Sequence, residues 1–368
     1  CTSSDSSIKW PTAGWEVTTA TSQGMNYDSL YAFSTQLESG DLGYIDGMLV
    51  IRNGMIVFEK EYTNDYDSLF KTTGTKLGKY NYYDPLWHPY YNNTRLHTMQ
   101  SVSKSFTAAA VGIAINNGSI PSLDEKIMDY FDEYESSTPD PRRDAMTIRD
   151  VLTMTTGIQW DEFSMPYTDP TSNCVQMEES LDWIQYVIDQ PMAFEPGEKY
   201  EYNSGATMLL SYLINKTTGQ DLADYVKTNL FESLGITDYY WKHTPTGLTD
   251  AEGGLYLRSR DLAKFGYLYL HNGKWGNNQV MPENWVENTQ AKPVDTIWPK
   301  FKYGFQWWLM PYGKSHTALL ASGLGGQRMI VLPELDIVAV FTGWNIYEKP
   351  ALDSWMAMNK MIDAVIDE

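Results

Sequence analysis

Cysteine and histidine are scarce in this sequence of 368 residues. Its two cysteines, Cys1 and Cys174, are too few for a disulfide framework and lack the paired spacing of a zinc site. The five histidines are scattered, and no two are spaced to bind a metal from one face of a helix. We therefore expect no metal and no other cofactor.

Positive charge and long apolar runs are also in short supply. The chain has 27 Lys and Arg residues against 47 Asp and Glu residues, which gives a formal net charge of −20. An exterior with this charge repels phosphate backbones and anionic membrane surfaces, so nucleic acid is excluded as a partner. No segment approaches the roughly 20 consecutive apolar residues that a membrane-spanning helix needs.

The first residues are polar, with Cys1 followed by Thr2–Ser7. This resembles the start of a mature bacterial lipoprotein, in which the first cysteine carries the lipid. We predict a polar tether over residues 1–22 and one folded domain over 23–368, and we expect an exported bacterial protein, periplasmic or at the cell surface, anchored through Cys1. The alternative is that Cys1 marks an arbitrary boundary. The oligomeric state is left open.

Strand patterns occur at both ends of the chain and helical periodicity in the middle. Asn53-Gly54, typical of a tight hairpin turn, separates two apolar runs at 47–52 and 55–61. Later strands are predicted at 303–309 and, on either side of Pro333-Glu-Leu-Asp336, at 328–332 and 337–341. Helices are predicted at 101–116, 147–154, 179–190, 205–216, 221–234, 259–270 and 351–366, and Thr147-Ile-Arg-Asp150 resembles a capping box. We predict an α/β (α+β) fold, with an antiparallel sheet built from both termini and flanked by helices. The sheet lobe spans about 23–100 and 250–368, and a mostly helical lobe of about 101–249 is inserted between.

Ser101 and Lys104 are one helical turn apart at the start of an apolar helix, so both side chains point to one face. A serine hydroxyl needs a base at neutral pH, and a lysine serves only as the neutral amine. Burial and the positive end of the helix dipole both favour that form, so we expect a lowered pKa for Lys104. Ser6 to Lys9 and Ser68 to Lys71 share the spacing but open no long apolar helix, and an isolated pair of this kind is usually a helix cap with a solvated lysine.

Five segments follow one another in a recognisable order. They are Ser101-Val-Ser-Lys104-Ser-Phe, Thr147-Ile-Arg-Asp-Val-Leu-Thr-Met-Thr-Thr-Gly157, Pro196-Gly-Glu-Lys-Tyr-Glu-Tyr-Asn-Ser204, Gly253-Gly-Leu-Tyr-Leu-Arg-Ser-Arg-Asp-Leu-Ala263 and Gly323-Leu-Gly-Gly-Gln327. In that order they resemble the serine β-lactamase and penicillin-binding-protein superfamily, particularly its class C-like esterase and peptidase branch. The resemblance covers about residues 25–368.

The resemblance implies a role for each matching residue. Ser101 is the expected nucleophile and Lys104 its base, with the helix N-terminus supplying N–H groups for a developing oxyanion. Tyr202-Asn203-Ser204 matches the second motif of the family. Tyr202 would pass a proton to the leaving group, and Ser204 would hydrogen-bond the lysine. The alternative for Tyr202 is a core aromatic, as Tyr200 two residues earlier also is.

The third motif of the family, usually Lys-Thr-Gly or His-x-Gly, falls at Ala321-Ser322-Gly323, where the match is imperfect. Gly323 would let the backbone approach the substrate, and the amide of Leu324 would complete the oxyanion hole. Ala321 lacks the cation that commonly holds a substrate carboxylate in the family. Replacement by Lys314, His316 or Arg328 would need a different route, so the sequence does not favour efficient hydrolysis of penicillins or cephalosporins.

The function predicted from these residues is a serine hydrolase that forms an acyl-enzyme on Ser101 and hydrolyses an ester or amide of a small substrate. One alternative is a β-lactamase or D-alanyl-D-alanine carboxypeptidase acting on β-lactams or peptidoglycan peptides. Another is a non-catalytic penicillin-binding or sensor module. The aromatic stretch 77–93 is predicted as a loop that either walls the substrate pocket or packs on the surface. At least one of Trp307 and Trp308 should be a core residue, and Cys174 should be structural.

Overall fold

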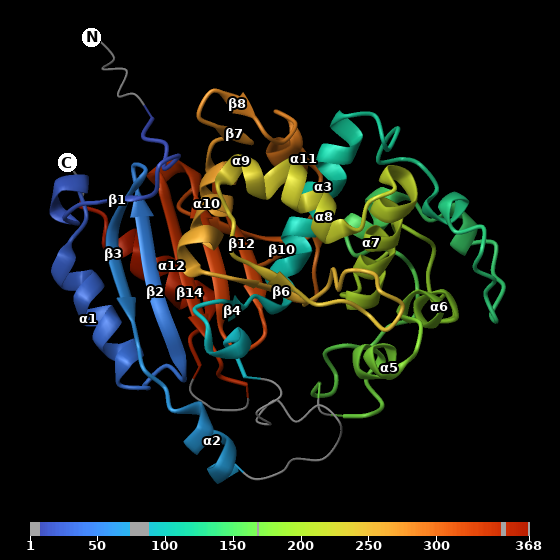
Figure 1. The fold of residues 1–368 in the computed structure, drawn as a ribbon, viewed down its shortest axis with the longest axis horizontal. Helices are drawn as coiled ribbons and strands as arrows, with labels where there is room; N and C mark the ends of the chain where they lie inside the picture. The colour runs from blue at the N-terminus through green and yellow to red at the C-terminus, as the bar shows by residue number, and fades with distance from the viewer. Residues whose placement is uncertain (1–7, 74–87, 168, 347–350, 367–368) are drawn as a thin grey trace.

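The computed structural model describes residues 8–73, 88–167, 169–346 and 351–366. A mixed sheet runs through its centre (Figure 1). Its order in the described residues is β1 (Glu16–Val17), β3 (Met55–Glu61), β2 (Ile45–Arg52), β14 (Ile337–Gly343), β13 (Gln327–Leu332), β12 (His316–Gly323), β11 (Trp307–Tyr312), β10 (Lys302–Gly304) and β9 (Val294–Asp295). Neighbours pair antiparallel except β1 with β3. The predicted sheet from both ends of the chain is confirmed.

Turn residues at the predicted positions close the hairpins of this sheet. Asn53 and Gly54 between β2 and β3 have φ values of 51° and 73°, the left-handed backbone that such a turn requires. Asp336, with φ of 49°, closes the turn between β13 and β14. Both hairpins place their apolar side chains alternately on the two faces of the sheet.

Each face of the sheet is covered by helices, which creates two cores (Figure 1). On one face, α1 (Tyr27–Glu38) and α12 (Ser354–Asp363) pack over residues such as Leu320 and Ile330. On the other, α10 (Ser259–Leu270) and α3 (Ser103–Asn116) pack over residues such as Ala321 and Met329. The sheet position of β12 therefore brings its end, Ser322 and Gly323, close to the start of α3.

The middle of the chain is mostly helical, as predicted. It contains α4 (Ile148–Leu152), α5 (Asn173–Glu179), α6 (Trp183–Ile188), α7 (Ser204–Thr218), α8 (Leu222–Val226) and α9 (Glu232–Leu234), with α2 (Tyr66–Thr73) before it and α11 (Trp285–Ala291) after it. Short strands β4 (His97–Thr98), β6 (Leu255–Leu257) and β5 (Tyr240–Trp241) form a second sheet, and β7 (Lys274–Trp275) pairs with β8 (Asn278–Gln279). The predicted capping box of Thr147 and Asp150 is present at α4.

One predicted strand, 303–309, is wrong because a turn divides it into β10 and β11. Phe305 and Gln306 have φ values of 42° and 65°. Hydrogen bonds hold Gln306 in this conformation: its side-chain amide donates to the carbonyl of Val151 at 2.9 Å, and its own carbonyl accepts from Ser105 at 2.9 Å. These partners lie far away in sequence, so local pattern alone could not reveal the turn.

Residues 10–17, which the prediction places in the polar tether 1–22, pack on the folded domain instead. Trp10 and Trp15 pack against Tyr267, with ring centroids 5.8 and 5.5 Å apart, and β1 joins the sheet. Two tryptophans give this segment the apolar area to dock, which the seven residues before it lack. Cys1 lies outside the described residues.

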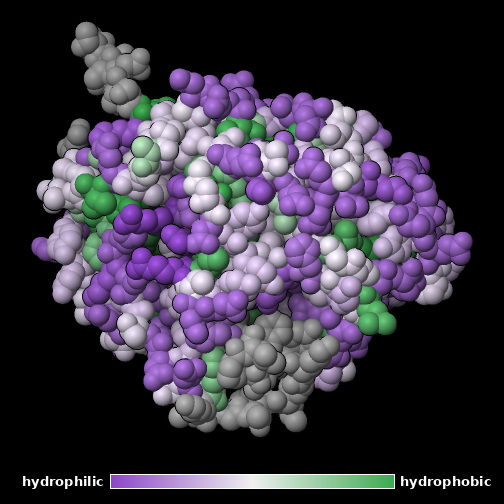
Figure 2. Space-filling view, viewed as in Figure 1, coloured by the Kyte–Doolittle hydropathy of each residue, from purple (hydrophilic) through white to green (hydrophobic). Residues whose placement is uncertain are grey.

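The surface carries little continuous apolar area on the face shown in Figure 2, where hydrophilic residues surround small apolar patches. Within the described ranges, we find no helix whose length and apolar content would let it cross a bilayer. Of the aromatic stretch 77–93, residues 77–87 lie outside the described residues. Tyr91 stacks on Tyr240 at 3.8 Å between ring centroids, away from the cavity described next.

Candidate active site

Ser101 lies in a tight turn, Gln100–Val102, that leads directly into α3. Gln100 has φ of 49°, a left-handed conformation that costs a non-glycine residue about 1–2 kcal/mol. Its carbonyl accepts from Ser103 Oγ at 2.7 Å. Leu255 fixes the same turn from β6, because its carbonyl accepts from Met99 N at 2.8 Å and its N–H donates to Ser103 Oγ at 3.1 Å. The strained turn presents Ser101 to a cavity.

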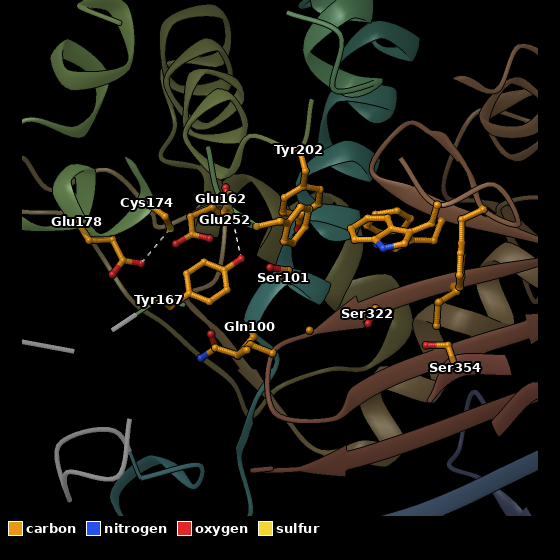
Figure 3. Close-up of a pocket in the computed structure, with 17 residues that line it drawn as sticks. Gln100, Ser101, Glu162, Tyr167, Cys174, Glu178, Tyr202, Glu252, Ser322 and Ser354 are labelled. Carbon is orange, nitrogen blue, oxygen red and sulfur yellow. Dashed lines mark hydrogen bonds between the residues drawn. The ribbon is translucent and has the colours of Figure 1, made fainter. Parts of the chain in front are cut away.

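This cavity has a volume of about 330 Å³ and contains Ser101 near its middle (Figure 3). Cys174 and Glu178 lie toward one side of Ser101, and Ser322 and Ser354 lie toward the other. The lining residues are Gln100, Ser101, Glu162, Phe163, Tyr167, Cys174, Glu178, Tyr202, Glu252, Trp298, Phe301, Trp308, Leu320, Ser322, Gly323, Leu324 and Ser354.

Lys104 lies one turn along α3 from Ser101 and is 1% exposed. Its Nζ is 3.0 Å from Ser101 Oγ, 2.7 Å from the carbonyl oxygen of Glu252 and 3.1 Å from Glu252 Oε2. Three acceptors match the three N–H donors of an ammonium group. The structure thus brings the predicted nucleophile and lysine into contact, and it adds a carboxylate to them.

The expectation of a lowered Lys104 pKa is wrong. Burial does favour the neutral amine, but the attraction of the Tyr202 oxygen and of the Glu252 and Glu162 carboxylates outweighs it, and the pKa lies above its usual value. Lys104 is therefore an ammonium ion in the resting protein. The sequence pattern showed the apolar helix and its dipole, but nothing in it indicated that two distant carboxylates would surround the amine.

Tyr202 lies just before α7 and reaches the same cavity, with its ring centroid 5.4 Å from Lys104 Nζ. Burial raises the pKa of its phenol, while Lys104 and a hydrogen bond with Ser101 act in the opposite direction. The phenol is therefore protonated at neutral pH. Tyr200, the alternative candidate, packs against Tyr303 and does not line the cavity, and its hydroxyl has no hydrogen-bond partner among the described residues.

Ser204 does not hydrogen-bond Lys104, contrary to our expectation. Its Oγ donates to Glu162 Oε1 at 2.5 Å, and its N–H donates to Glu162 Oε2 at 2.8 Å. Trp160 and Tyr167 also donate to this carboxylate, each at 2.8 Å. Burial raises the pKa of Glu162, and Lys104 partly offsets this. Sequence reasoning missed Glu162, which lies in a segment without a recognisable motif, so Ser204 anchors a carboxylate instead of the lysine.

Acidic groups gather at one end of the cavity. Glu252 Oε2 forms an ion pair with Lys104. Burial acts to raise the pKa of the Glu252 carboxyl, but Lys104 and hydrogen bonds outweigh the effect of burial, so that this pKa lies below its usual value. Burial and the neighbouring Glu252 raise the pKa of Glu178 well above its usual range, and those same causes raise the pKa of Asp250 to about 7. Glu252 is thus the ionised member of the group, and Glu178 is the protonated one.

Cys174 also lines this acidic end, although we expected a purely structural residue. Its Sγ is 4.0 Å from Glu178 Oε1, and burial raises the pKa of the thiol. Cys174, Glu178 and Glu252 hold ligand-type atoms within 4.8 Å of one another. Glu252 already neutralises Lys104, however, and Glu178 is protonated, so the charge of the group does not favour a divalent cation. The absence of a metal remains a prediction.

Gly323 allows β12 to approach the turn that carries Ser101. A Cβ atom at this position would lie 2.4 Å from the carbonyl oxygen of Met99 and 3.0 Å from Gln100 Cβ. Gly323 and Leu324 both line the cavity next to Ser101, where we predicted the second half of an oxyanion hole. Their role in binding an oxyanion remains a prediction.

The three residues considered as replacements for a cation at Ala321 occupy different places. Lys314 is exposed in the turn after β11, and His316 is 3.7 Å from Glu334, away from the cavity. Arg328 is the one that contacts a cavity residue, through a hydrogen bond from its Nε to Ser354 Oγ at 3.1 Å.

Aromatic side chains also line the cavity, and Phe301 connects them to the start of α12 by packing against Trp355, with ring centroids 5.6 Å apart. Trp298 and Phe301 lie 5.3 and 5.9 Å from Trp308 between ring centroids, and Phe163 lies 5.0 Å from Trp298. Trp307, next in sequence to Trp308, is fully buried in the core. The prediction that one of these neighbouring tryptophans is a core residue is confirmed, and the other faces the site.

Comparison with known proteins finds sequence relatives that are named as hydrolases and β-lactamases. The chain is 26% identical over 264 residues to a 6-aminohexanoate-dimer hydrolase of Paenarthrobacter ureafaciens, covering 66% of this chain and 65% of that protein. It is 25% identical over 175 residues to a β-lactamase of Pseudomonas fluorescens, covering 48% and 43%. The chain thus spans less than two thirds of the length of either relative.

The fold is also that of a family VIII carboxylesterase of known structure. The TM-score is 0.67 with 14% identity, over 95% of this chain and 98% of that one. The family model described as Beta-lactamase matches residues 47–344, which include Ser101, Lys104, Tyr202 and Gly323. This chain therefore belongs to the Beta-lactamase family.

Proposed function

We propose that the protein is a serine hydrolase that cleaves an ester or amide of a small substrate through an acyl-enzyme on Ser101. The contact of 3.0 Å between Ser101 Oγ and Lys104 Nζ, at the centre of a cavity that Tyr202 also lines, is the observation that carries the proposal. Relatives named as hydrolases support it at the level of the family.

The proton inventory of the site indicates how Ser101 is activated. In the resting state Lys104 and Tyr202 both hold their protons, so neither can accept another. Loss of one proton from this pair to solvent leaves either a neutral amine or a phenolate beside Ser101, and either form is a base. Ser101 Oγ then attacks the substrate carbonyl carbon while its own proton moves to the pair.

The later steps reuse the same groups. The amides of Ser101 and Leu324 would stabilise the tetrahedral oxyanion, and Tyr202 would protonate the leaving alcohol or amine as the carbon–heteroatom bond breaks. Water then attacks the acyl carbon, gives a proton to the Lys104–Tyr202 pair, and releases the acid while Ser101 regains its proton.

The aromatic residues that line the cavity indicate which kinds of substrate would fit. Phe163, Trp298 and Trp308 offer an apolar wall for a carbon chain or ring. The relative named for the 6-aminohexanoate dimer supports a linear amide, whereas the relative named β-lactamase supports the alternative of a β-lactam. The expected cell-surface location and lipid at Cys1 remain proposals that the described residues do not address.

Covalent labelling tests the proposal. The protein is treated with a fluorophosphonate and, separately, with a penicillin, and the modified peptide is identified by mass spectrometry. We expect fluorophosphonate label on Ser101, none in Ser101→Ala, and undiminished label in Ser29→Ala, a control at an exposed serine of α1 outside the cavity. Label that persists in Ser101→Ala contradicts the assignment.

Turnover then separates the candidate functions. Hydrolysis of p-nitrophenyl esters without hydrolysis of nitrocefin supports an esterase or amidase. Rapid nitrocefin hydrolysis supports a β-lactamase, and a stable penicillin adduct supports a peptidase or a non-catalytic penicillin-binding module.

A further inference from the structure

We propose that His97 and Asp46 form a buried, hydrogen-bonded ion pair that positions the turn of Ser101 for attack on the substrate. His97 belongs to β4, just before this turn, and Asp46 belongs to β2 of the central sheet. The inference rests on the proposed hydrolase function, because it concerns the reactivity of the same serine. It assigns a positioning role to two residues that do not line the cavity and that the mechanism above does not use.

The first observation is the burial of two ionisable side chains. The side chains of His97 and Asp46 are 3% and 1% exposed, and His97 Nε2 lies 2.9 Å from Asp46 Oδ2. Moving charged groups out of water is costly, and a hydrogen-bonded partner of opposite charge offsets that cost. Replacement of such a pair by apolar residues often leaves stability unchanged, so its presence points to a role other than stability.

The second observation is the charge state that the hydrogen bonds of the pair require. Nδ1 of His97 lies 2.9 Å from the carbonyl oxygen of Thr98, which only accepts, so this nitrogen carries a proton. Asp46 accepts from Asn64 Nδ2 and from the hydroxyl of Tyr66, each at 2.8 Å, and these donors stabilise its carboxylate form. Nε2 of His97 therefore donates to Asp46 as well, and the ring is an imidazolium ion.

The third observation is the path of hydrogen bonds from this pair to the nucleophile. Thr98 accepts at two atoms, from His97 at its carbonyl oxygen and from Gln100 Nε2 at its Oγ1, the latter at 3.0 Å. Gln100 directly precedes Ser101, has the left-handed φ of 49° and lines the cavity (Figure 3). A non-glycine residue keeps such a conformation only where its surroundings fix it. Asp46, His97 and Thr98 thus link Gln100 to the central sheet, in which β2 is paired on both sides.

The groups packed around the pair leave its charges to each other. The ring of Tyr90 meets the His97 ring edge-on, with centroids 4.8 Å apart, and Tyr66 reaches Asp46 from α2. Burial, together with the negative charge of Asp46, raises the pKa of both tyrosines, so each is a neutral phenol at neutral pH. His97 is therefore the cation that directly balances Asp46, and its ring has one orientation that satisfies both nitrogens.

A neutral double variant tests the positioning role. In Asp46→Asn/His97→Phe both charges are removed together, the amide oxygen can still accept hydrogen bonds, and a ring of similar size replaces the imidazole. No unpaired buried charge remains, so the variant is expected to fold. We expect the maximum rate of fluorophosphonate labelling at Ser101 to fall by about 10- to 100-fold, as misplacement of a reacting group would cause. The reagent concentration that gives half of this rate should stay the same, because other segments form the apolar wall of the cavity.

A conservative variant and a matched control separate positioning from stability. Asp46→Asn alone should keep most of the labelling rate, because its amide can donate to Nε2 of a neutral His97 and so preserve the link. His271→Phe replaces a half-buried histidine that packs on Tyr267 outside the cavity, and it should keep the rate even where its melting temperature falls. An unchanged rate in the folded double variant overturns the proposal, as does a loss in Asp46→Asn that equals the loss in the double variant.

Thr98→Val serves if the double variant does not fold. It keeps both charges and the shape of the side chain but removes the oxygen that accepts from Gln100. Loss of one such hydrogen bond should lower the labelling rate by about 2- to 10-fold. A folded Thr98→Val protein that is labelled as fast as the parent contradicts the link between the pair and the nucleophile.

Nuclear magnetic resonance of the histidine ring nitrogens distinguishes a failure of this inference from a failure of the proposed function. The signals of His97 are assigned by their loss in the double variant. In the parent protein at neutral pH they should show protons on both nitrogens, whereas Asp46→Asn should leave a proton on one. A single proton on His97 in the parent protein contradicts the ion pair. Failure of the proposed function looks different, because the imidazolium is then present but Ser101 takes no label.

Discussion

Glu252→Gln is expected to shift the pH dependence of hydrolysis toward lower pH. The active form requires loss of one proton from the Lys104–Tyr202 pair, and the carboxylate of Glu252, 3.1 Å from Lys104 Nζ, opposes that loss. Coulomb's law gives an attraction of about 1.3 kcal/mol at this distance with the dielectric constant of water and about 5 kcal/mol with an effective value of about 20. Because about 1.4 kcal/mol corresponds to one pKa unit, the pKa of the pair should fall by roughly 1 to 4.

Replacing Glu252 by glutamine removes a negative charge without removing the backbone contact of Lys104. The backbone carbonyl of Glu252 holds Lys104 Nζ at 2.7 Å, and glutamine keeps it. The measurement is kcat/KM for a neutral p-nitrophenyl ester against pH, corrected for spontaneous hydrolysis, with circular dichroism as the check of folding. Glu178→Gln is the matched control: this carboxyl is already protonated, so its replacement removes no charge and the midpoint should stay in place. A folded Glu252→Gln protein with an unchanged or more alkaline midpoint would refute the reasoning.

Three further predictions concern single groups. Tyr202→Phe should lower kcat/KM by about 10²- to 10⁴-fold. Tyr200→Phe should not, because it removes a hydroxyl that has no hydrogen-bond partner among the described residues; equal loss in both variants would deny Tyr202 a role in proton transfer. Gly323→Ala should lower both the melting temperature and the activity, because the new methyl group would lie 2.4 Å from the carbonyl oxygen of Met99. Overpacking of this kind typically costs about 1–3 kcal/mol of stability. A variant as stable and as active as the parent would show that the backbone moves to accommodate the methyl group. Burial and Glu252 raise the pKa of Asp250 in the folded protein to about 7, so the folded protein binds more protons than the unfolded chain between about pH 4 and 7. The stabilisation that comes from protonated Asp250 is therefore complete below about pH 4 and is lost as the pH rises through 7. In Asp250→Asn the fall of urea midpoint across this range should be less steep, and an identical slope would count against the raised pKa.

The sequence predicted those parts of the fold and site that depend on local patterns. The hairpin at Asn53-Gly54 and the capping box at Thr147 rest on residues next to one another, and both are present. The contact of Ser101 with Lys104 follows from helix spacing. The turn at Gln306, in contrast, is held by Val151 and Ser105, so no local pattern could show it.

The charge state of the site could not be predicted in the same way. Glu162 and Glu252 reach Lys104 from segments about 60 and 150 residues further along the chain, and neither belongs to a motif whose chemistry we had interpreted. Their carboxylates reverse the expected direction of the Lys104 pKa and take Ser204 away from the lysine. A local pattern identified which groups meet, but their protonation depends on every charge nearby.

Hydrogen bonds between β6 and the start of α3 make the reactivity of Ser101 depend on the completion of folding. Leu255 forms hydrogen bonds with Met99 and Ser103, and the carbonyl of Glu252 accepts a hydrogen bond from Lys104. The conformation of the turn around Ser101 therefore depends on a segment that lies about 150 residues later in the chain. A partly assembled chain would keep the serine but lose its nucleophilic geometry. Reaction with a fluorophosphonate should therefore report late assembly of the native protein during refolding, after helix content has already returned.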